Sequence, residues 1–97
     1  MKVIYTAEAK QDVRDIVSYY EREQVGLGDQ FLGALTGTIE LLREFPLSSR
    51  KIGQGVRRAV FPKPFLYNLY YSPNRAQNTL LILAVAHQRR HPDAWKR

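Results

Sequence analysis

The residues best suited to chemistry lie near the end of the chain, at positions 87–95. They directly follow the longest apolar run of the sequence, residues 80–86, which predicts a strand buried on both faces. A buried strand holds the groups at its end rigidly, as a binding or catalytic site requires. The His87 imidazole can exchange protons near neutral pH, and Arg89 and Arg90 supply positive charge. We therefore expect a functional site at this end of the chain.

His87 and His91 are four residues apart, a spacing that places two side chains on one face of a helix. The strand before His87 and Pro92 after His91 argue against a helix here, and no third ligand is evident. The chain has no cysteine, which excludes disulfides and thiolate zinc sites. We predict no metal site and no cofactor.

A second charged pair, Arg57-Arg58, lies where the hydrophobic period changes to two. In a strand the two side chains point to opposite faces, so only one of them can face the helices. If the C-terminal strands form a meander, His87 and one of these arginines can reach one groove. A histidine beside an arginine supplies a group that can accept a proton next to a group that can bind an anion.

The length of 97 residues predicts one domain, spanning residues 1–97, with a core of modest size. Neither a signal peptide nor a membrane-spanning run is apparent, so we expect a cytoplasmic protein without a membrane partner. Residues 1–46 carry five basic and eight acidic side chains, whereas residues 47–97 carry ten basic and one acidic. A basic half of this kind favours nucleic acid or an acidic protein as partner.

Two amphipathic helices precede the basic half. A strand at residues 1–5 leads to the first helix, for which Thr6 is a suitable N-cap and which fades near Gly26. The second helix begins near Asp29 and ends at Pro46, so the two form an antiparallel hairpin. A loop is predicted at 47–54, and strands at 56–61, 65–71 and 79–87. The order β-α-α-β-β-β predicts an α+β fold, with the helical hairpin on one face of a mainly antiparallel sheet.

These segments together resemble the RelE/ParE superfamily of bacterial toxins from type II toxin–antitoxin systems, over nearly the whole chain. The matching motifs are Ala9-x-x-Asp12-Val13-x-x-Ile16-x-x-Tyr19-Tyr20, Phe31-x-x-x-Leu35-x-x-x-Ile39-x-x-Leu42-x-x-x-Pro46, Gly55-Val56-Arg57-Arg58 and Val85-x-His87-x-Arg89-Arg90-x-Pro92-x-x-Trp95. The last motif is most similar to the ParE-like and plasmid-stabilisation branches.

The resemblance implies a toxin neutralised by a cognate antitoxin, with operator DNA bound only through the antitoxin. ParE-like members inhibit DNA gyrase by binding, whereas RelE-like members cut mRNA on the ribosome. Nuclease members hold catalytic groups at positions that match His87 and Arg57 or Arg58. This chain lacks the tyrosine after the last strand and the dense lysine set of RelE-like members. We therefore favour a gyrase inhibitor without enzymatic activity; an mRNA interferase and a non-toxic nucleic-acid-binding module are the alternatives.

Candidate residues for contacts with target and antitoxin are Arg57, Arg58, Arg89, Arg90, Trp95, Gly33 and Gly37. The two glycines lie on the second helix, opposite its apolar stripe, and each costs about 1 kcal/mol relative to alanine. They are either a smooth strip against which an antitoxin segment or second protomer packs, or tolerated surface glycines. Structural roles are also open in the tail: His87 can cap the sheet end, and Trp95 can close the edge of the core.

Overall fold

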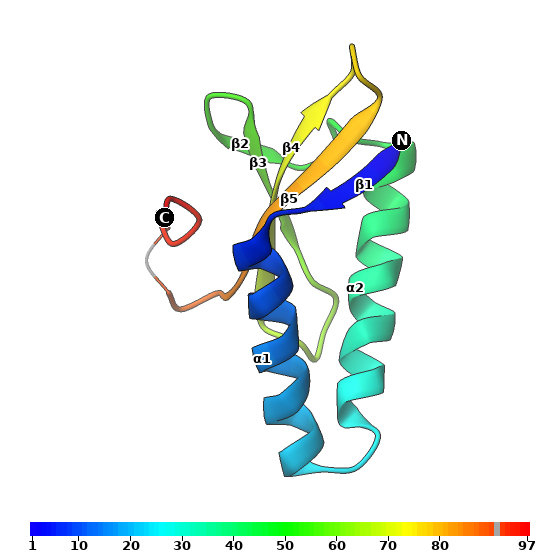
Figure 1. The fold of residues 1–97 in the computed structure, drawn as a ribbon, viewed down its shortest axis with the longest axis vertical. Helices are drawn as coiled ribbons and strands as arrows, with labels where there is room; N and C mark the ends of the chain where they lie inside the picture. Colours follow the sequence, from blue (N-terminus) through cyan, green and yellow to red (C-terminus); the bar gives the residue numbers. More distant parts are fainter. Residues whose placement is uncertain (91) are drawn as a thin grey trace.

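The strands and helices follow one another in the order β-α-α-β-β-β-β in the computed structural model, which describes residues 1–90 and 92–97 (Figure 1). The bounds are β1 Lys2–Tyr5, α1 Ala7–Glu23, α2 Leu27–Glu44, β2 Arg50–Gly53, β3 Val56–Val60, β4 Tyr67–Asn74 and β5 Thr79–His87. The strands form one sheet in the order β1-β5-β4-β3-β2. The β1–β5 pair is parallel and the other three pairs are antiparallel.

The predicted α+β class and helical hairpin are confirmed, but the predicted loop at 47–54 is wrong for Arg50–Gly53, which form β2. This strand pairs with β3 through the two-residue turn Gln54-Gly55, in which Gly55 has a positive φ of 71°. A glycine in a two-residue connection indicates a hairpin, but the serines and basic residues that precede this glycine are equally typical of a loop. Strand β4 also runs on to Asn74, beyond the predicted end at residue 71.

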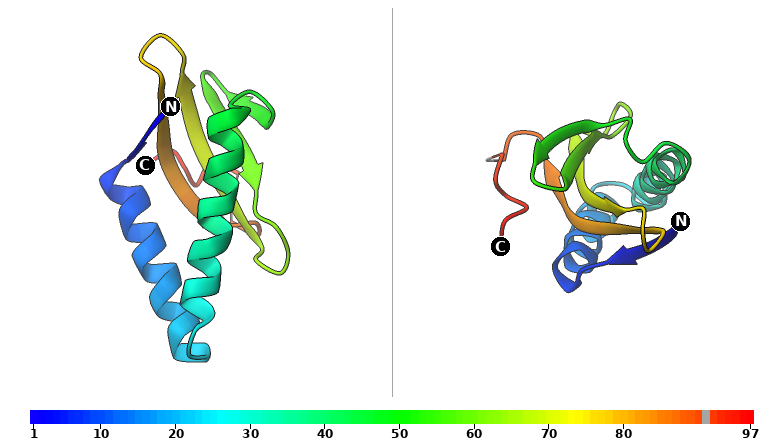
Figure 2. Two further views of the ribbon diagram at one scale, coloured as in Figure 1. Left: turned by 90° about the vertical axis from the view of Figure 1, so that its right-hand side faces the viewer. Right: turned by 90° about the horizontal axis from the view of Figure 1, so that it is seen from above.

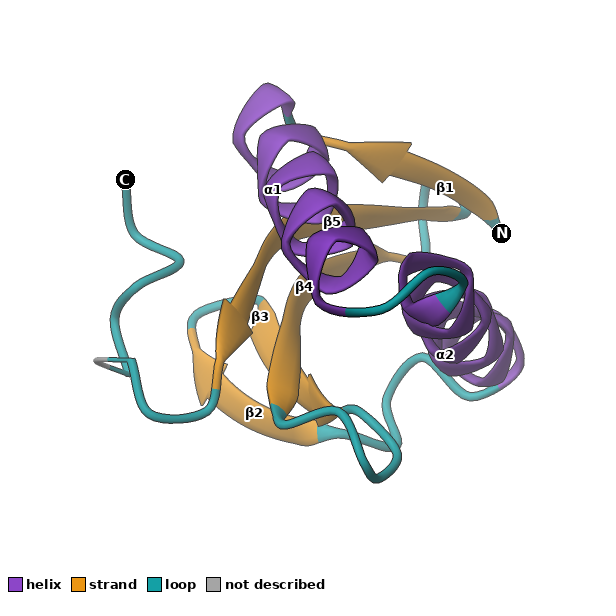
Figure 3. Cartoon of the chain, turned by 90° about the horizontal axis from the view of Figure 1, so that it is seen from below, coloured by secondary structure: helices purple, strands orange, loops and turns teal. Residues whose placement is uncertain are grey.

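The two faces of the sheet are covered by different parts of the chain. Helices α1 and α2 lie on one face, and the C-terminal segment lies on the other (Figures 2 and 3). On the helical face, the core includes Phe31, Leu69 and Ile82, all fully buried. On the outer face, a smaller cluster is formed by Tyr70, Ala84, Ala86, Ile52, Leu83, Ala94 and Trp95.

Five aromatic rings form the centre of the core between the hairpin and the sheet. Phe31 of α2 stacks on Phe61, with ring centroids 5.2 Å apart and an interplanar angle of 11°, and on Tyr20 of α1 at 5.8 Å. Phe65 and Tyr67 meet the Phe31 ring edge-on at 5.5 and 5.4 Å. Aromatic pairs in these geometries stabilise a core beyond the area that they bury. Phe31 therefore joins both helices to the sheet.

The helices of the hairpin are capped by side chains. Thr6 Oγ1 accepts a hydrogen bond from the Ala9 N–H at 3.0 Å, which confirms the predicted N-cap of α1. Glu21 Oε1 accepts from the N–H groups of Gly26 and Gly28, both at 2.9 Å, and places a carboxylate at the start of α2. A Cβ at Gly28 would lie 2.8 Å from Glu21 Cγ, so this approach requires glycine. Among the described residues, neither helix has the length and apolarity needed to cross a membrane.

Replacing Phe31 by alanine should lower the free energy of unfolding by about 3–5 kcal/mol, because the cavity removes the ring contacts of both helices. The matched control is Leu32→Ala on the exposed side of α2, for which we expect less than about 1 kcal/mol. Urea denaturation followed by circular dichroism measures both. Equal losses in the two variants would contradict the central role of Phe31.

Candidate functional site

His87 is the last residue of β5 and pairs with Tyr67 of β4. Its Nδ1 accepts a hydrogen bond from the backbone N–H of Arg89 at 3.1 Å, and its ring meets Tyr67 edge-on at 5.3 Å. Because Nδ1 is an acceptor, the proton of the neutral ring is on Nε2. These contacts agree with the structural role in which His87 caps the end of the sheet through the backbone.

A shallow hollow of about 220 Å³ lies beside His87, between α1 and the end of β5. It is lined by Asp12, Asp15, Ile16, Tyr67, Val85, Ala86, His87 and Arg90. Burial, followed by the influence of nearby Tyr20, raises the pKa of Tyr67 to about 12. The Tyr67 hydroxyl is therefore protonated at neutral pH and is not a base. Within residues 1–90 and 92–97, no three His, Asp or Glu side chains gather as metal ligands.

The structure does not bring His87 together with Arg57 or Arg58. On β4, Arg58 is level with Tyr70, whereas His87 is level with Tyr67. His87 is therefore three residues along the strand direction and two strands across from Arg58, about 10 Å in each direction at ordinary sheet spacings. The histidine and arginines needed for RNA cleavage do not share a groove in this conformation.

Arg57 and Arg58 point to opposite faces, as the period of two predicts. Arg57 pairs with Tyr71, whose side chain belongs to the helical-face core, and Arg58 pairs with Tyr70 of the outer-face cluster. Arg57 Nη1 donates to the carbonyl groups of Leu47 and Ser49 at 3.2 and 2.7 Å. Arg57 thus holds the loop between α2 and β2 in place.

The C-terminal segment lies against the outer face through Trp95. The indole packs on the cluster that includes Tyr70 and Ala84, and a Cβ at Gly53 would lie 3.3 Å from Trp95 Cζ2. Lys96 Nζ lies 5.4 Å from the centre of the indole. Arg89 and Arg90 are exposed in the turn before this segment, and His91 lies outside the described residues. Trp95 therefore packs on a second, smaller core.

Asp12 is a site residue that sequence reasoning missed. Its Oδ2 accepts a hydrogen bond from the Val85 N–H at 3.0 Å, and Arg97 donates to both carboxylate oxygens at 2.9 and 2.8 Å. Arg97 Nη2 also donates to the Leu83 carbonyl at 2.9 Å. The hydrogen bond to Asp12 raises the pKa of Arg97 above its ordinary value. The available signal was spacing, because Asp12 is three residues after Ala9 and so lies at the edge of the apolar stripe.

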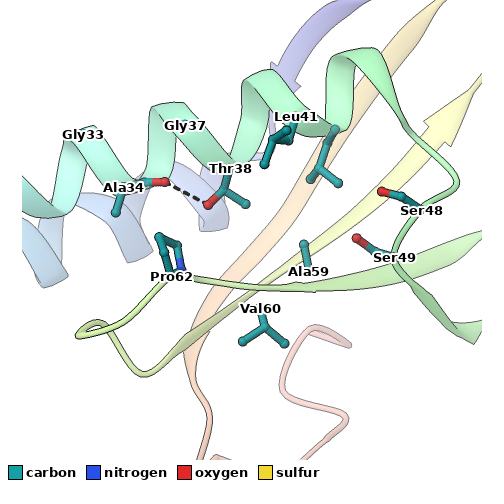
Figure 4. Close-up of a pocket in the computed structure, with 11 residues that line it drawn as sticks. Gly33, Ala34, Gly37, Thr38, Leu41, Ser48, Ser49, Ala59, Val60 and Pro62 are labelled. Carbon is teal, nitrogen blue, oxygen red and sulfur yellow. Dashed lines mark hydrogen bonds between the residues drawn. The ribbon is translucent and has the colours of Figure 1, made fainter.

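Gly33 and Gly37 border a groove of about 490 Å³ between α2 and the edge of β3 (Figure 4). Across it lie Ser49, Val60 and Pro62. A Cβ built at either glycine meets no atom within 4 Å, so the fold itself does not require glycine there. The groove is mainly apolar and open to solvent on the side of the glycines.

Comparison with known proteins places this geometry in a family. The family profile described as "ParE toxin of type II toxin-antitoxin system, parDE" matches residues 3–92. A solved structure titled "Chromosomal ParDE TA system from P. aeruginosa" superposes with a TM-score of 0.61 at 16% sequence identity, over 90% of this chain and 95% of that chain. At that identity the superposition shows a shared fold. No curated protein sequence matches this chain.

Asp12→Ala should lower the free energy of unfolding by about 1–3 kcal/mol, because it leaves the Val85 N–H without an acceptor and removes the carboxylate that binds the Arg97 guanidinium. Asp15→Ala on the same helix is the control; Asp15 is exposed and accepts from Gln11, so we expect less than about 0.5 kcal/mol. Hydrogen exchange adds a local readout, since the Val85 amide should lose protection in Asp12→Ala. Unchanged protection of Val85 would exclude this role of Asp12.

Proposed function

The chain belongs to the ParE toxin family of type II toxin–antitoxin systems, and from this premise we propose that it inhibits DNA gyrase by binding. The family match over residues 3–92 carries the proposal. The placement of the candidate catalytic groups supports it, because Arg57 is engaged by backbone carbonyls and His87 accepts from a backbone amide. These contacts favour inhibition by binding over RNA cleavage.

The ribosome-dependent mRNA interferase gains no support from this geometry. General acid–base cleavage requires the base and the phosphate-binding cations within hydrogen-bond reach of one substrate group. His87 is separated from Arg57 and Arg58 along and across the sheet. The hollow beside His87 is also lined by Asp15 and Arg90, which are the other candidates for acid–base chemistry there. Among the residues that line this hollow, Arg90 is the one cation beside His87, and no arginine of the sheet lines it.

We propose further that the cognate antitoxin neutralises the toxin by packing apolar side chains into the groove beside Gly33 and Gly37, and that operator DNA is bound through the antitoxin. Leu41 and Val60 at this groove are 63% and 62% exposed. Phe45 and Leu47, which follow α2 in the chain, are also exposed. Exposed apolar side chains beside an apolar groove mark a contact with another protein.

Purified toxin should reduce negative supercoiling of plasmid DNA by gyrase in proportion to its concentration, because binding to the enzyme blocks its cycle. Induction in cells should stop division and cause filamentation, and primer extension on translated mRNA should show no codon-specific cuts. Toxin mixed with its antitoxin before addition is the control and should leave supercoiling intact. Unchanged gyrase activity at saturating toxin, or ribosome-dependent cuts, would refute the proposal.

Gly37→Leu should weaken the antitoxin complex by about 1–3 kcal/mol, because the added side chain occupies the groove. The isolated toxin should be stabilised by about 0.5–1 kcal/mol, since leucine favours the helix over glycine. Thr36→Leu is the control: Thr36 is exposed on α2 but does not line the groove, so affinity should not change. Isothermal titration calorimetry gives the affinities, and equal affinity of Gly37→Leu and wild type would exclude this groove as the antitoxin site.

A further inference from the structure

The hairpin of β2 and β3 sets like charges opposite each other. Its register places Arg50 opposite Arg58 and Lys51 opposite Arg57. Side chains in directly opposed positions are close neighbours, and like charges there destabilise the sheet. Four cations therefore gather on two short strands in an arrangement that folding alone does not favour.

The rest of the domain does little to neutralise these cations. Arg57 is held by two backbone carbonyls. Arg50, Lys51 and Arg58 form no ion pair with any carboxylate in residues 1–90 and 92–97. Their positive charge is thus available to an anionic partner.

Arg50 and Arg58 lie on the outer face of the sheet. Arg58 is paired with Tyr70, whose ring belongs to the outer-face cluster beneath Trp95, and Arg50 is opposite Arg58. Lys96 also lies beside the indole, but its charge is paired with Asp93 at 3.4 Å, so Arg50 and Arg58 are the cations on which the inference rests. Eight of the nine acidic side chains belong to α1 and α2, which cover the other face (Figure 3). The molecule therefore has an acidic helical layer and a basic outer face.

We infer that this outer face binds the phosphate backbone of duplex DNA, with Arg50 and Arg58 each holding a phosphate group and no base being read. Guanidinium groups bind phosphate oxygens with bidentate geometry. Duplex DNA carries one negative charge per about 1.7 Å of its axis, so phosphate groups are spaced closely enough for two neighbouring arginines to bind one each. The inference goes beyond gyrase inhibition, because the contact requires DNA and this chain alone.

The test is fluorescence anisotropy of a short mixed-sequence duplex with purified toxin over a series of salt concentrations. In Arg50→Gln/Arg58→Gln, the slope of log affinity against log salt should fall by about two, and affinity near 0.1 M salt should fall about tenfold or more. The midpoint of thermal unfolding should be unchanged or higher, because the repulsion across the hairpin is relieved. A double lysine variant, which keeps the charge, should retain the slope.

Lys10→Gln/Arg14→Gln is the matched control, since it removes the same charge from exposed positions on α1 and should leave DNA binding unchanged. Equal losses in both glutamine variants, or wild-type binding by Arg50→Gln/Arg58→Gln, would overturn the inference. It would also be overturned if the latter variant kept its DNA affinity and instead lost antitoxin, which would assign the arginines to an acidic protein. Gyrase is absent from this assay, so its outcome is separable from that of the supercoiling experiment.

Discussion

The shortness of β1 is the constraint on which much of this structure depends. Strand β1 ends at Tyr5, opposite Ile82, while β5 continues to His87. The backbone of β5 beyond Ile82 therefore lacks a strand on that side, and buried backbone groups must find other partners. Thr6 and Arg97 reach the Leu83 carbonyl and Asp12 reaches the Val85 N–H. Because Asp12 also binds Arg97, the same contacts anchor the C-terminal segment that covers the outer face.

The sheet has a second open edge, at the end of β3, and no segment of the described chain pairs with it. Strand β2 pairs with β3 from Val56 to Arg58, so Val60 has no strand beside it on the side of β2. Where β5 is closed by charged and hydroxyl side chains of its own chain, β3 is bordered by an apolar groove and two helical glycines. An exposed strand edge is a liability that proteins usually cover. The contrast between the two edges is the physical basis for assigning the groove to a partner.

The parts of the fold predictable from sequence are those set by strong local patterns. Strand β5 spans Thr79–His87 as predicted, since a long apolar run allows little alternative, and Thr6 caps α1 as its side chain predicts. Strand β2 was not predicted from the sequence, because its stability comes from pairing with β3 and its own residues have a weak preference for strands. The role of Asp12 was hidden because it depends on where β1 stops, which no local pattern encodes. The separation of His87 from Arg57 and Arg58 likewise depends on register rather than on residue type.

The two surfaces proposed for partners share β3. Val60 borders the groove assigned to the antitoxin, and Arg58, two residues earlier, belongs to the basic face assigned to DNA. Residues two apart on a strand lie about 7 Å from each other. On these proposals, an antitoxin segment bound beside Val60 comes within reach of Arg58. An acidic side chain at the end of that segment competes with DNA phosphate for Arg58. Neutralisation then acts on both surfaces without a change in the conformation of the toxin.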